Sequence, residues 1–401
     1  MIKRLLFFLT IAALGLSSCS KSSSSTENSA KADSLFLADS IARQDSIEAV
    51  RMLPQDTLLD YTGRFLAGLD QKNQNFFTTL EDDKYWQEYK LMMDTSWAHM
   101  TRDRLSKMQE WEANHFSKQV NDTLPVFYPF SGPDFLHAQY VFPKTKTLVL
   151  AALEPIIEMP RIDTLSVKER DQFLDTLANS LRDIFNKSYF ITTHMKKDFK
   201  KVKGVLPFFY VFMERSGYEL LESKFVYIDS AGTENNVKAS ELHWHNSPAV
   251  KITFVNRATK EVKTLYYFSI SISNQGMIER PGFVKFIQSF GPVNTFVKSA
   301  SYLMHDKYFV EIKKLVLAQS QSIFQDDTGI PYRDFKKDPS WSIQLYGEYE
   351  KPVKDFKNEQ RFQTDLDSAY KKTKVEPLPF SLGYHWGTDK QNYMLLKKVN
   401  R

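Results

Sequence analysis

The sequence predicts a mixed α/β fold (α+β), in which helices pack on a mixed β-sheet. Three observations predict it: a strand-helix-strand unit at residues 124–158, helical spacing of apolar residues at 57–120, and strand pairs with hairpin-length connections in the C-terminal half. We therefore expect a single α/β globular domain over residues 57–401, with a helical N-terminal part at 57–120 and antiparallel hairpins in the C-terminal half.

The unit at 124–158 begins with β-branched and aromatic residues at 126–130 and ends with the apolar run 147–153. Both segments are typical of buried strands. Between them we expect a helix capped by Ser131, with Asp134 as its capping-box partner. One glycine stands where a GxGxxG fingerprint has three, so nucleotide binding ranks last among the functions considered.

Five residues lie at or just after the ends of these two strands: Tyr128, Ser131, Asp134, Glu154 and Glu158. Because α/β sheets bind ligands at the carboxyl ends of their strands, the five form a candidate ligand site. A structural interpretation stays open, in which residues 131–134 are a helix cap and Glu154 ends a strand.

Further elements follow in order along the chain. Helices are expected at 166–185, opened by a capping box, and at 207–215, which is apolar all round. The lysines between 196 and 203 could contact an anionic lipid or a glycan, or simply face solvent.

The C-terminal half alternates strands and helices. The predicted strands are 218–229, 249–256, 262–273 and 341–349; a closing hairpin joins 377–386 to 392–399, and helices occupy 281–290 and one or two segments within 294–324, with Asp306 as an N-cap.

His243 and His245 flank Trp244, and on a strand both rings would face the same side. With Glu241 they make a two-histidine, one-carboxylate set of the kind that binds metals. The segment is polar and ends at Pro248, so a loop is the other interpretation. No cofactor is predicted.

The adjacent carboxylates Asp326 and Asp327 precede a glycine, Tyr332 and Arg333. They form either a turn or part of an acid/base site, because like charges this close separate their pKa values. As an enzyme, the protein would be a hydrolase that uses Asp134, Glu154, His305 and Asp327, with Tyr332 and Arg333 orienting an anionic or sugar substrate. The serine-nucleophile pattern Gly-x-Ser-x-Gly does not occur.

The N-terminus combines a basic start, an apolar stretch at 5–14 and the sequence Leu16, Ser17, Ser18, Cys19. This pattern predicts a signal peptide at 1–18 and resembles the lipobox of bacterial lipoproteins, which implies lipidation of Cys19. A serine-rich tether is expected at 19–33 and a helical stalk at 34–56. Cys19 is the only cysteine, so no thiol remains for a disulfide or a catalytic nucleophile.

The formal net charge of +5 is spread among almost equal numbers of acids and bases, which does not favour nucleic-acid binding. Residues 127–134 (FYPFSGPD), 153–155 (LEP) and 325–332 (QDDTGIPY) are similar to segments of an uncharacterised family of exported bacterial lipoproteins. The similarity covers most of the mature chain and implies an envelope location, without an activity or site residues.

We therefore expect an outer-membrane lipoprotein that faces the periplasm. It would be held to the membrane by its lipid and would act as a non-enzymatic binding or structural protein, with an envelope protein or a glycan as partner; a lipid-anchored periplasmic hydrolase is the alternative.

Overall fold

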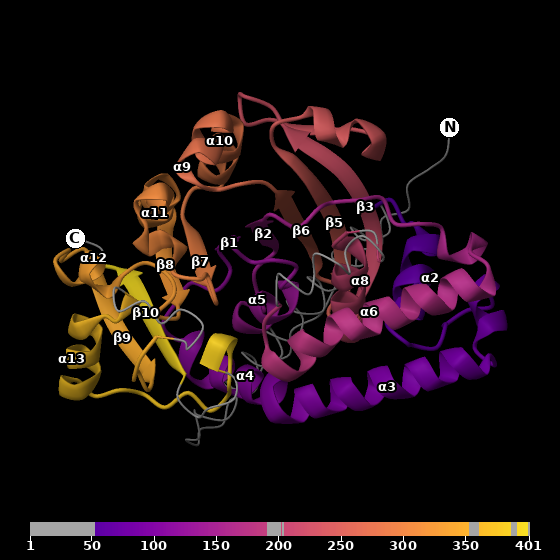
Figure 1. Ribbon diagram of the computed structural model, residues 1–401, viewed down its shortest axis with the longest axis horizontal. Helices are drawn as coiled ribbons and strands as arrows, with labels where there is room; N and C mark the ends of the chain where they lie inside the picture. Colours follow the sequence, from indigo (N-terminus) through magenta and orange to yellow (C-terminus); the bar gives the residue numbers. More distant parts are fainter. Residues whose placement is uncertain (1–52, 191–201, 203, 353–360, 386–390, 400–401) are drawn as a thin grey trace, which may run out of the picture. The chain divides into compact units, whose positions relative to one another are not determined.

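A mixed sheet of ten strands runs through the described part of the chain (Figure 1). Its strands are β1 (Val126–Pro129), β2 (Thr147–Ala152), β3 (Tyr218–Ile228), β4 (Glu234–Asn236), β5 (Pro248–Asn256), β6 (Val262–Ser269), β7 (Val293–Val297), β8 (Ser320–Gln325), β9 (Trp341–Gly347) and β10 (Asn392–Lys398). The spatial order is β4-β3-β5-β6-β2-β1-β7-β8-β10-β9. The central strands β6, β2, β1, β7 and β8 are parallel, and antiparallel pairs extend the sheet at both ends. The predicted mixed α/β fold is confirmed.

This computed structural model describes residues 53–190, 202, 204–352, 361–385 and 391–399. The predicted signal peptide, Cys19, the tether, most of the stalk and the lysines from 196 to 203 lie outside the described residues. Residues 50–401 form one unit by their internal contacts. No helix in the described part of the chain is long and apolar enough to cross a membrane.

Helices cover both faces of the sheet. One face packs against α2 (Thr57–Leu66), α3 (Lys84–Met100), α4 (Ser106–Trp111), α5 (Phe135–Val141), α6 (Val167–Lys187) and α8 (Leu206–Arg215). The other packs against α9 (Asn274–Glu279), α10 (Pro281–Ser289), α11 (Val310–Gln319), α12 (Tyr332–Lys336) and α13 (Thr364–Lys372). Alternation along β1 divides its side chains between two cores, with Tyr128 facing the first and Phe127 the second.

Two predictions about local structure are wrong, and a third is incomplete. Helix α5 is capped by Asp134 and not by Ser131, because the Asp134 carboxylate accepts the backbone N–H of His137. The segment 294–324 contains an expected helix, α11, and Asp306 caps a 3-10 turn just before it, but the strands β7 and β8 at its two ends were not predicted. Within the described residues, 377–385 contains no strand, and β10 pairs with β8 and β9 instead.

The missed strands are short and carry buried polar side chains, which weaken an apolar pattern. Asn294 of β7 accepts the hydroxyl of Ser322 of β8 at 2.6 Å, and Thr295 lies 2.6 Å from the hydroxyl of Ser320. These side chains satisfy one another inside the sheet, so their burial costs less than burial without partners.

The connections of the parallel strands diverge between β1 and β7. The chain leaves β1 toward α5 on one face of the sheet and leaves β7 toward α11 on the other. Such a divergence between adjacent parallel strands is a topological switch point, where α/β sheets open a crevice at their carboxyl ends.

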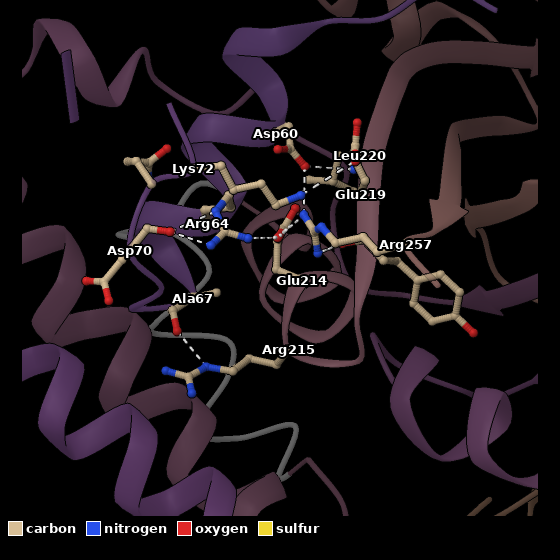
Figure 2. Close-up of polar contacts among 12 residues, drawn as sticks. Asp60, Arg64, Ala67, Asp70, Lys72, Glu214, Arg215, Glu219, Leu220 and Arg257 are labelled. Carbon is tan, nitrogen blue, oxygen red and sulfur yellow. Dashed lines mark hydrogen bonds and ion pairs between the residues drawn. The ribbon is translucent and has the colours of Figure 1, made fainter. Parts of the chain in front are cut away.

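A cluster of charged side chains attaches α2 to the sheet (Figure 2). Glu214 of α8 lies 2.7 Å from Arg257 of the β5–β6 hairpin and 3.7 Å from Arg64 of α2. Asp60 of α2 lies 3.0 Å from the same Arg257. Arg215 donates to the carbonyl of Ala67, 2.6 Å away, which satisfies the end of α2. The predicted helical part is therefore held to the domain by buried polar contacts as well as by apolar packing.

Candidate functional site

A cavity of about 210 Å³ lies at the switch point, beyond the carboxyl ends of β1, β2, β6 and β7. We call it the strand-end cavity. It is lined by Tyr128, Phe130, Ser131, Gly132, Asp134, Ala152, Leu153, Glu154, Tyr189, Phe190, Ile270, Ser271, Ile272, Lys298, Ser299, Ala300, Ser301, Leu303, Phe309 and Tyr384. Four residues predicted from the sequence thus come together there: Tyr128, Ser131, Asp134 and Glu154.

Two of the loops that line the cavity have strained backbones. Phe130 after β1 has a φ of 60°, and Ser299 and Ser301 after β7 have φ values of 55° and 53°. Left-handed conformations of this kind cost non-glycine residues of order 1–3 kcal/mol each and cluster at binding and active sites. Ser299 is held in place by its N–H, which donates to the Asp326 carboxylate at 2.8 Å.

Asp134 is the centre of a buried polar cluster at the cavity wall. Its carboxylate lies 2.7 Å from Lys298 Nζ, 2.7 Å from His137 Nδ1 and 3.1 Å from the Tyr128 hydroxyl, and it accepts the His137 backbone N–H as well. Lys298 also donates to the carbonyl of Ser188. The side chains of Asp134 and Lys298 are both 2 % exposed, so a carboxylate and an ammonium group neutralise each other inside the protein.

The surroundings fix the charges of this cluster. Burial alone raises the pKa of Asp134, but His137 and Lys298 outweigh it and bring the pKa to about 2. Burial lowers the pKa of His137 to about 4 against the opposing effect of Asp134. At pH 7 the ring is therefore neutral, and Lys298 supplies the positive charge that Asp134 needs.

Asp134 is a poor general base in this arrangement. Its pKa lies far below neutrality, and its oxygens already accept four hydrogen bonds. The carboxylate fixes the loop after β1 to the loop after β7. Its role is to hold the cavity wall, while Glu154, which accepts the Tyr267 hydroxyl at 3.3 Å, lies at the end of β2.

Apolar side chains dominate the rest of the lining. Leu153, at the end of β2, is 74 % exposed beside the opening, and Phe309 and Ile272 line the cavity with it. An exposed leucine next to a concave apolar surface favours contact with an apolar molecule.

The remaining predicted residues lie elsewhere. Asp327 is fully buried and accepts the Tyr302 hydroxyl at 2.6 Å and the Asn392 amide at 3.1 Å. His305 and Arg333 line a different cavity, described below. Tyr332 begins α12, where its N–H donates to Gln363, and Glu158 is exposed. The four proposed catalytic residues therefore do not line one cavity.

His243 lies in a 3-10 helix, η5 (Ala239–Trp244), and His245 directly follows it. His245 stacks on Tyr227 with ring centroids 3.6 Å apart, whereas His243 is exposed beside Trp244. Across the residues that the structure describes, no group of three or more His, Cys, Asp or Glu side chains could hold a metal ion.

Most of the cavity lining was not predicted from the sequence, including the two polar residues Lys298 and Ser299. Both follow β7, which lies in a segment predicted to be helical. The available signal was the short run Val293, Phe296 and Val297 followed by small polar residues, which is typical of a strand end. Comparisons with protein-family models, curated proteins and solved structures found no match.

Proposed function

We propose that this protein is a lipid-anchored binding protein of the bacterial cell envelope, and that its domain holds a small, mainly apolar ligand in the strand-end cavity. The pattern of Leu16, Ser17, Ser18 and Cys19 supports the anchor. The position of the cavity at a topological switch point supports the binding role.

The observation that carries the binding proposal is the concentration of backbone strain around one cavity. Among the described residues, six non-glycine residues have positive φ; Phe130, Ser299 and Ser301 line the strand-end cavity, and Tyr302 directly follows. A stable sheet does not need strained residues in two separate loops. Strain retained on both sides of a concave site supports selection for the shape of that site.

The size and charge of the cavity indicate the class of ligand. Drug-sized ligands occupy roughly 300–1,000 Å³, whereas an apolar cavity on the order of 150 Å³ holds a benzene ring. A cavity of about 210 Å³ therefore suits one aromatic ring or a short alkyl chain. Asp134 and Lys298 neutralise each other, so this pair offers no net charge to a ligand, and Glu154 is the remaining carboxylate in the lining.

A matched pair of exposed leucines provides the test. Leu153 is 74 % exposed at the cavity, and Leu91 is 67 % exposed on α3. Indole and hexanol would be titrated into the full chain and followed by ligand-observed NMR. We expect Leu153→Asp to weaken binding about tenfold, because a desolvated carboxylate opposes apolar contact, and Leu91→Asp to leave it unchanged.

The binding proposal fails if neither probe binds saturably, or if both aspartate variants weaken binding equally. Equal effects would indicate nonspecific adsorption to the surface of the protein.

One observation favours ester hydrolysis as a second candidate function. The hydroxyl of Ser299 is buried and has no hydrogen-bond partner among the described residues, although Ser299 lines the strand-end cavity. A strained serine directly beyond a parallel strand resembles a nucleophile elbow. The neighbouring Asp326 accepts the backbone N–H of Ser299 at 2.8 Å, and burial and Asp327 raise its pKa to about 6. To act as a general base it would need the Ser299 hydroxyl, which makes no hydrogen bond to it in the structure, to rotate toward it.

In this reaction Ser299 Oγ would attack the ester carbonyl carbon while its proton passes to Asp326. The departing alkoxide would take that proton, and water would then hydrolyse the acyl-serine, returning a proton to Ser299. The N–H groups of Ser299 and Ala300 already donate to Asp326 and Thr328, and the N–H of Ser131 donates to the carbonyl of Ala151, so these three groups are not free to act as oxyanion donors.

A fluorophosphonate probe distinguishes hydrolysis from binding alone. A serine hydrolase would be labelled at Ser299, and Ser299→Ala would abolish labelling. Ser301→Ala is the control, because Ser301 lines the same cavity but lies 2.8 Å from the hydroxyl of Tyr384. Absence of label on the intact chain, or a label elsewhere, would reject hydrolysis by Ser299.

A further inference from the structure

A second cavity, of about 890 Å³, lies between α12, the start of α13 and the 3-10 turns η6 (Leu303–His305) and η7 (Lys307–Phe309). We call it the basic cavity. Its lining includes five cationic side chains, from Lys307, Arg333, Lys336, Lys337 and Arg361. Their convergence on one concave surface is independent of the strand-end cavity and of its proposed ligand.

The positive charge of the basic cavity is not neutralised by the described residues. Two carboxylates, Asp306 and Asp365, also line it. Each already accepts a backbone N–H at 3.0 Å, from Tyr308 and Leu366 respectively. Five cations against two carboxylates leave an excess of positive charge. This excess attracts an anion, and a bound anion would reduce the repulsion among the cations.

Nearby ion pairs do not change this balance. Within the described part of the chain, the closest carboxylate to any of the five cations is that of Asp334, 4.0 Å from Arg333 Nε. Arg333 is 69 % exposed, so this contact contributes little. Arg361 donates to the carbonyl of Tyr302 at 3.1 Å, which orients its guanidinium group without neutralising it.

The start of α13 borders the same cavity. This helix spans nine residues, and its N-cap residue Gln363 makes no side-chain cap. The Gln363 amide instead bridges the carbonyl of Asp327 and the N–H of Tyr332. Thr364 and Asp365, in the first turn, line the cavity. The Asp365 carboxylate accepts the N–H of Leu366, and Asp365 and Asp367 place two negative charges in the first turn. The helix start therefore adds no net positive charge, and the cationic side chains supply the attraction for an anion.

From these contacts we propose that the basic cavity binds a phosphate-bearing anion, either a phosphorylated small molecule or the phosphate of an anionic lipid headgroup. A phosphate group carries up to two negative charges and several acceptor oxygens, which matches a mixed set of arginine and lysine donors. A single carboxylate would accept hydrogen bonds from fewer of these donors than a phosphate group and would neutralise less of the excess positive charge.

The experiment uses the full chain in nonionic detergent and two phosphate sources. Inorganic pyrophosphate is titrated by calorimetry at constant ionic strength, and phosphatidylglycerol is added to mixed micelles with phosphatidylcholine as the zwitterionic reference. Lys337→Glu reverses one charge inside the cavity. Lys168→Glu makes the same change on the exposed side of α6, away from the cavity, and is the matched control.

We expect saturable binding of at least one source, weakened about tenfold or more by Lys337→Glu and less than twofold by Lys168→Glu. Saturation by pyrophosphate identifies a free phosphate ligand, and saturation only by phosphatidylglycerol identifies a lipid headgroup. The proposal is overturned if neither source binds saturably, or if the two variants weaken binding equally. Thermal denaturation of both variants verifies that they are folded.

Discussion

At the scale of single residues, Asp134 connects local structure with the proposed site. Its carboxylate begins α5 by accepting the N–H of His137, and it also pairs with Lys298 across the switch point. The first contact is local and can be read from a sequence. The second joins positions that are far apart in the chain, and it requires β7 to lie next to β1.

Replacement of Lys298 alone should lower the free energy of unfolding far more than replacement of both Lys298 and Asp134. Lys298→Met leaves the Asp134 carboxylate buried without its cation, and we expect a loss of about 3–5 kcal/mol in the free energy of unfolding. Asp134→Asn should also destabilise the protein, because Lys298 then lacks its counter-charge. In the double variant the unpaired charge is absent, so its loss should be clearly smaller than the sum of the single losses.

Urea unfolding of the two single variants and the double variant measures this coupling. Lys168→Met, at an exposed position on α6, provides a control for loss of a lysine. Additive single losses would show that Asp134 and Lys298 do not interact energetically, and that their pair does not hold the cavity wall.

At the scale of elements, the charge cluster around Glu214 determines how α2 is attached. Burial, followed by the nearby Asp60, raises the pKa of Glu214 well above its usual value, and Arg257 opposes this increase. Because the folded protein holds this proton more tightly than the unfolded chain does, the contribution of Glu214 to stability falls as pH rises above about 4.5.

Replacement of Arg257 should therefore destabilise the protein in a pH-dependent way. Arg257→Met leaves Asp60 and Glu214 together without their shared cation, with Arg64, 3.7 Å from Glu214, as the remaining cation. We expect a loss of about 3 kcal/mol in the free energy of unfolding at pH 8. The loss should be smaller at pH 5, where Glu214 can take up a proton and lose its negative charge.

Urea midpoints at pH 5 and pH 8 provide the measurement. Arg102→Met is the control, because Arg102 pairs with Asp103 on the exposed surface, and we expect no measurable change at either pH. An equal loss at both pH values for Arg257→Met would contradict protonation of Glu214 as the source of the difference.

The sequence predicted those elements whose signals are local. Helix α6 begins with the expected capping box of Ser166 and Glu169, and β1 and β2 follow their apolar runs. Strands β7 and β8 were missed, since buried polar partners such as Asn294 and Ser322 interrupt their apolar pattern. Hydrogen bonds between neighbouring strands offset the cost of burying these polar side chains. The sequence of one strand does not show which strand it pairs with, so this compensation could not be predicted.

The candidate site was predicted only in part, because only some of its residues belong to locally recognisable elements. Tyr128, Ser131, Asp134 and Glu154 lie at the ends of predicted strands and line the strand-end cavity. His305 and Asp327 were grouped with them by chemistry alone, and the fold separates His305 into the basic cavity. Residue types suggest a reaction, but topology decides which side chains meet.

At the scale of the whole molecule, one sheet supports both proposed sites. The parallel centre places strained loops at the switch point, and antiparallel strands extend the sheet on either side. Helices on both faces bury the central strands, which is usual for parallel sheets. The strand-end cavity and the basic cavity have different linings, so substitutions in one can be tested without changing the other.

The proposed anchor belongs to the molecule as a whole, and Cys19 tests it. Lipidation at Cys19 would attach acyl chains, and each buried methylene contributes about 0.8 kcal/mol to membrane binding. Two or more acyl chains therefore hold a protein stably at the membrane.

We expect the full-length protein to remain with the membrane fraction after a high-salt wash, and Cys19→Ser to be released into the soluble fraction. Ser22→Ala, in the predicted tether, is the control and should stay bound. Retention of Cys19→Ser after the same wash would disprove lipid anchoring, whereas its release with unchanged indole binding would separate the anchor from the strand-end cavity.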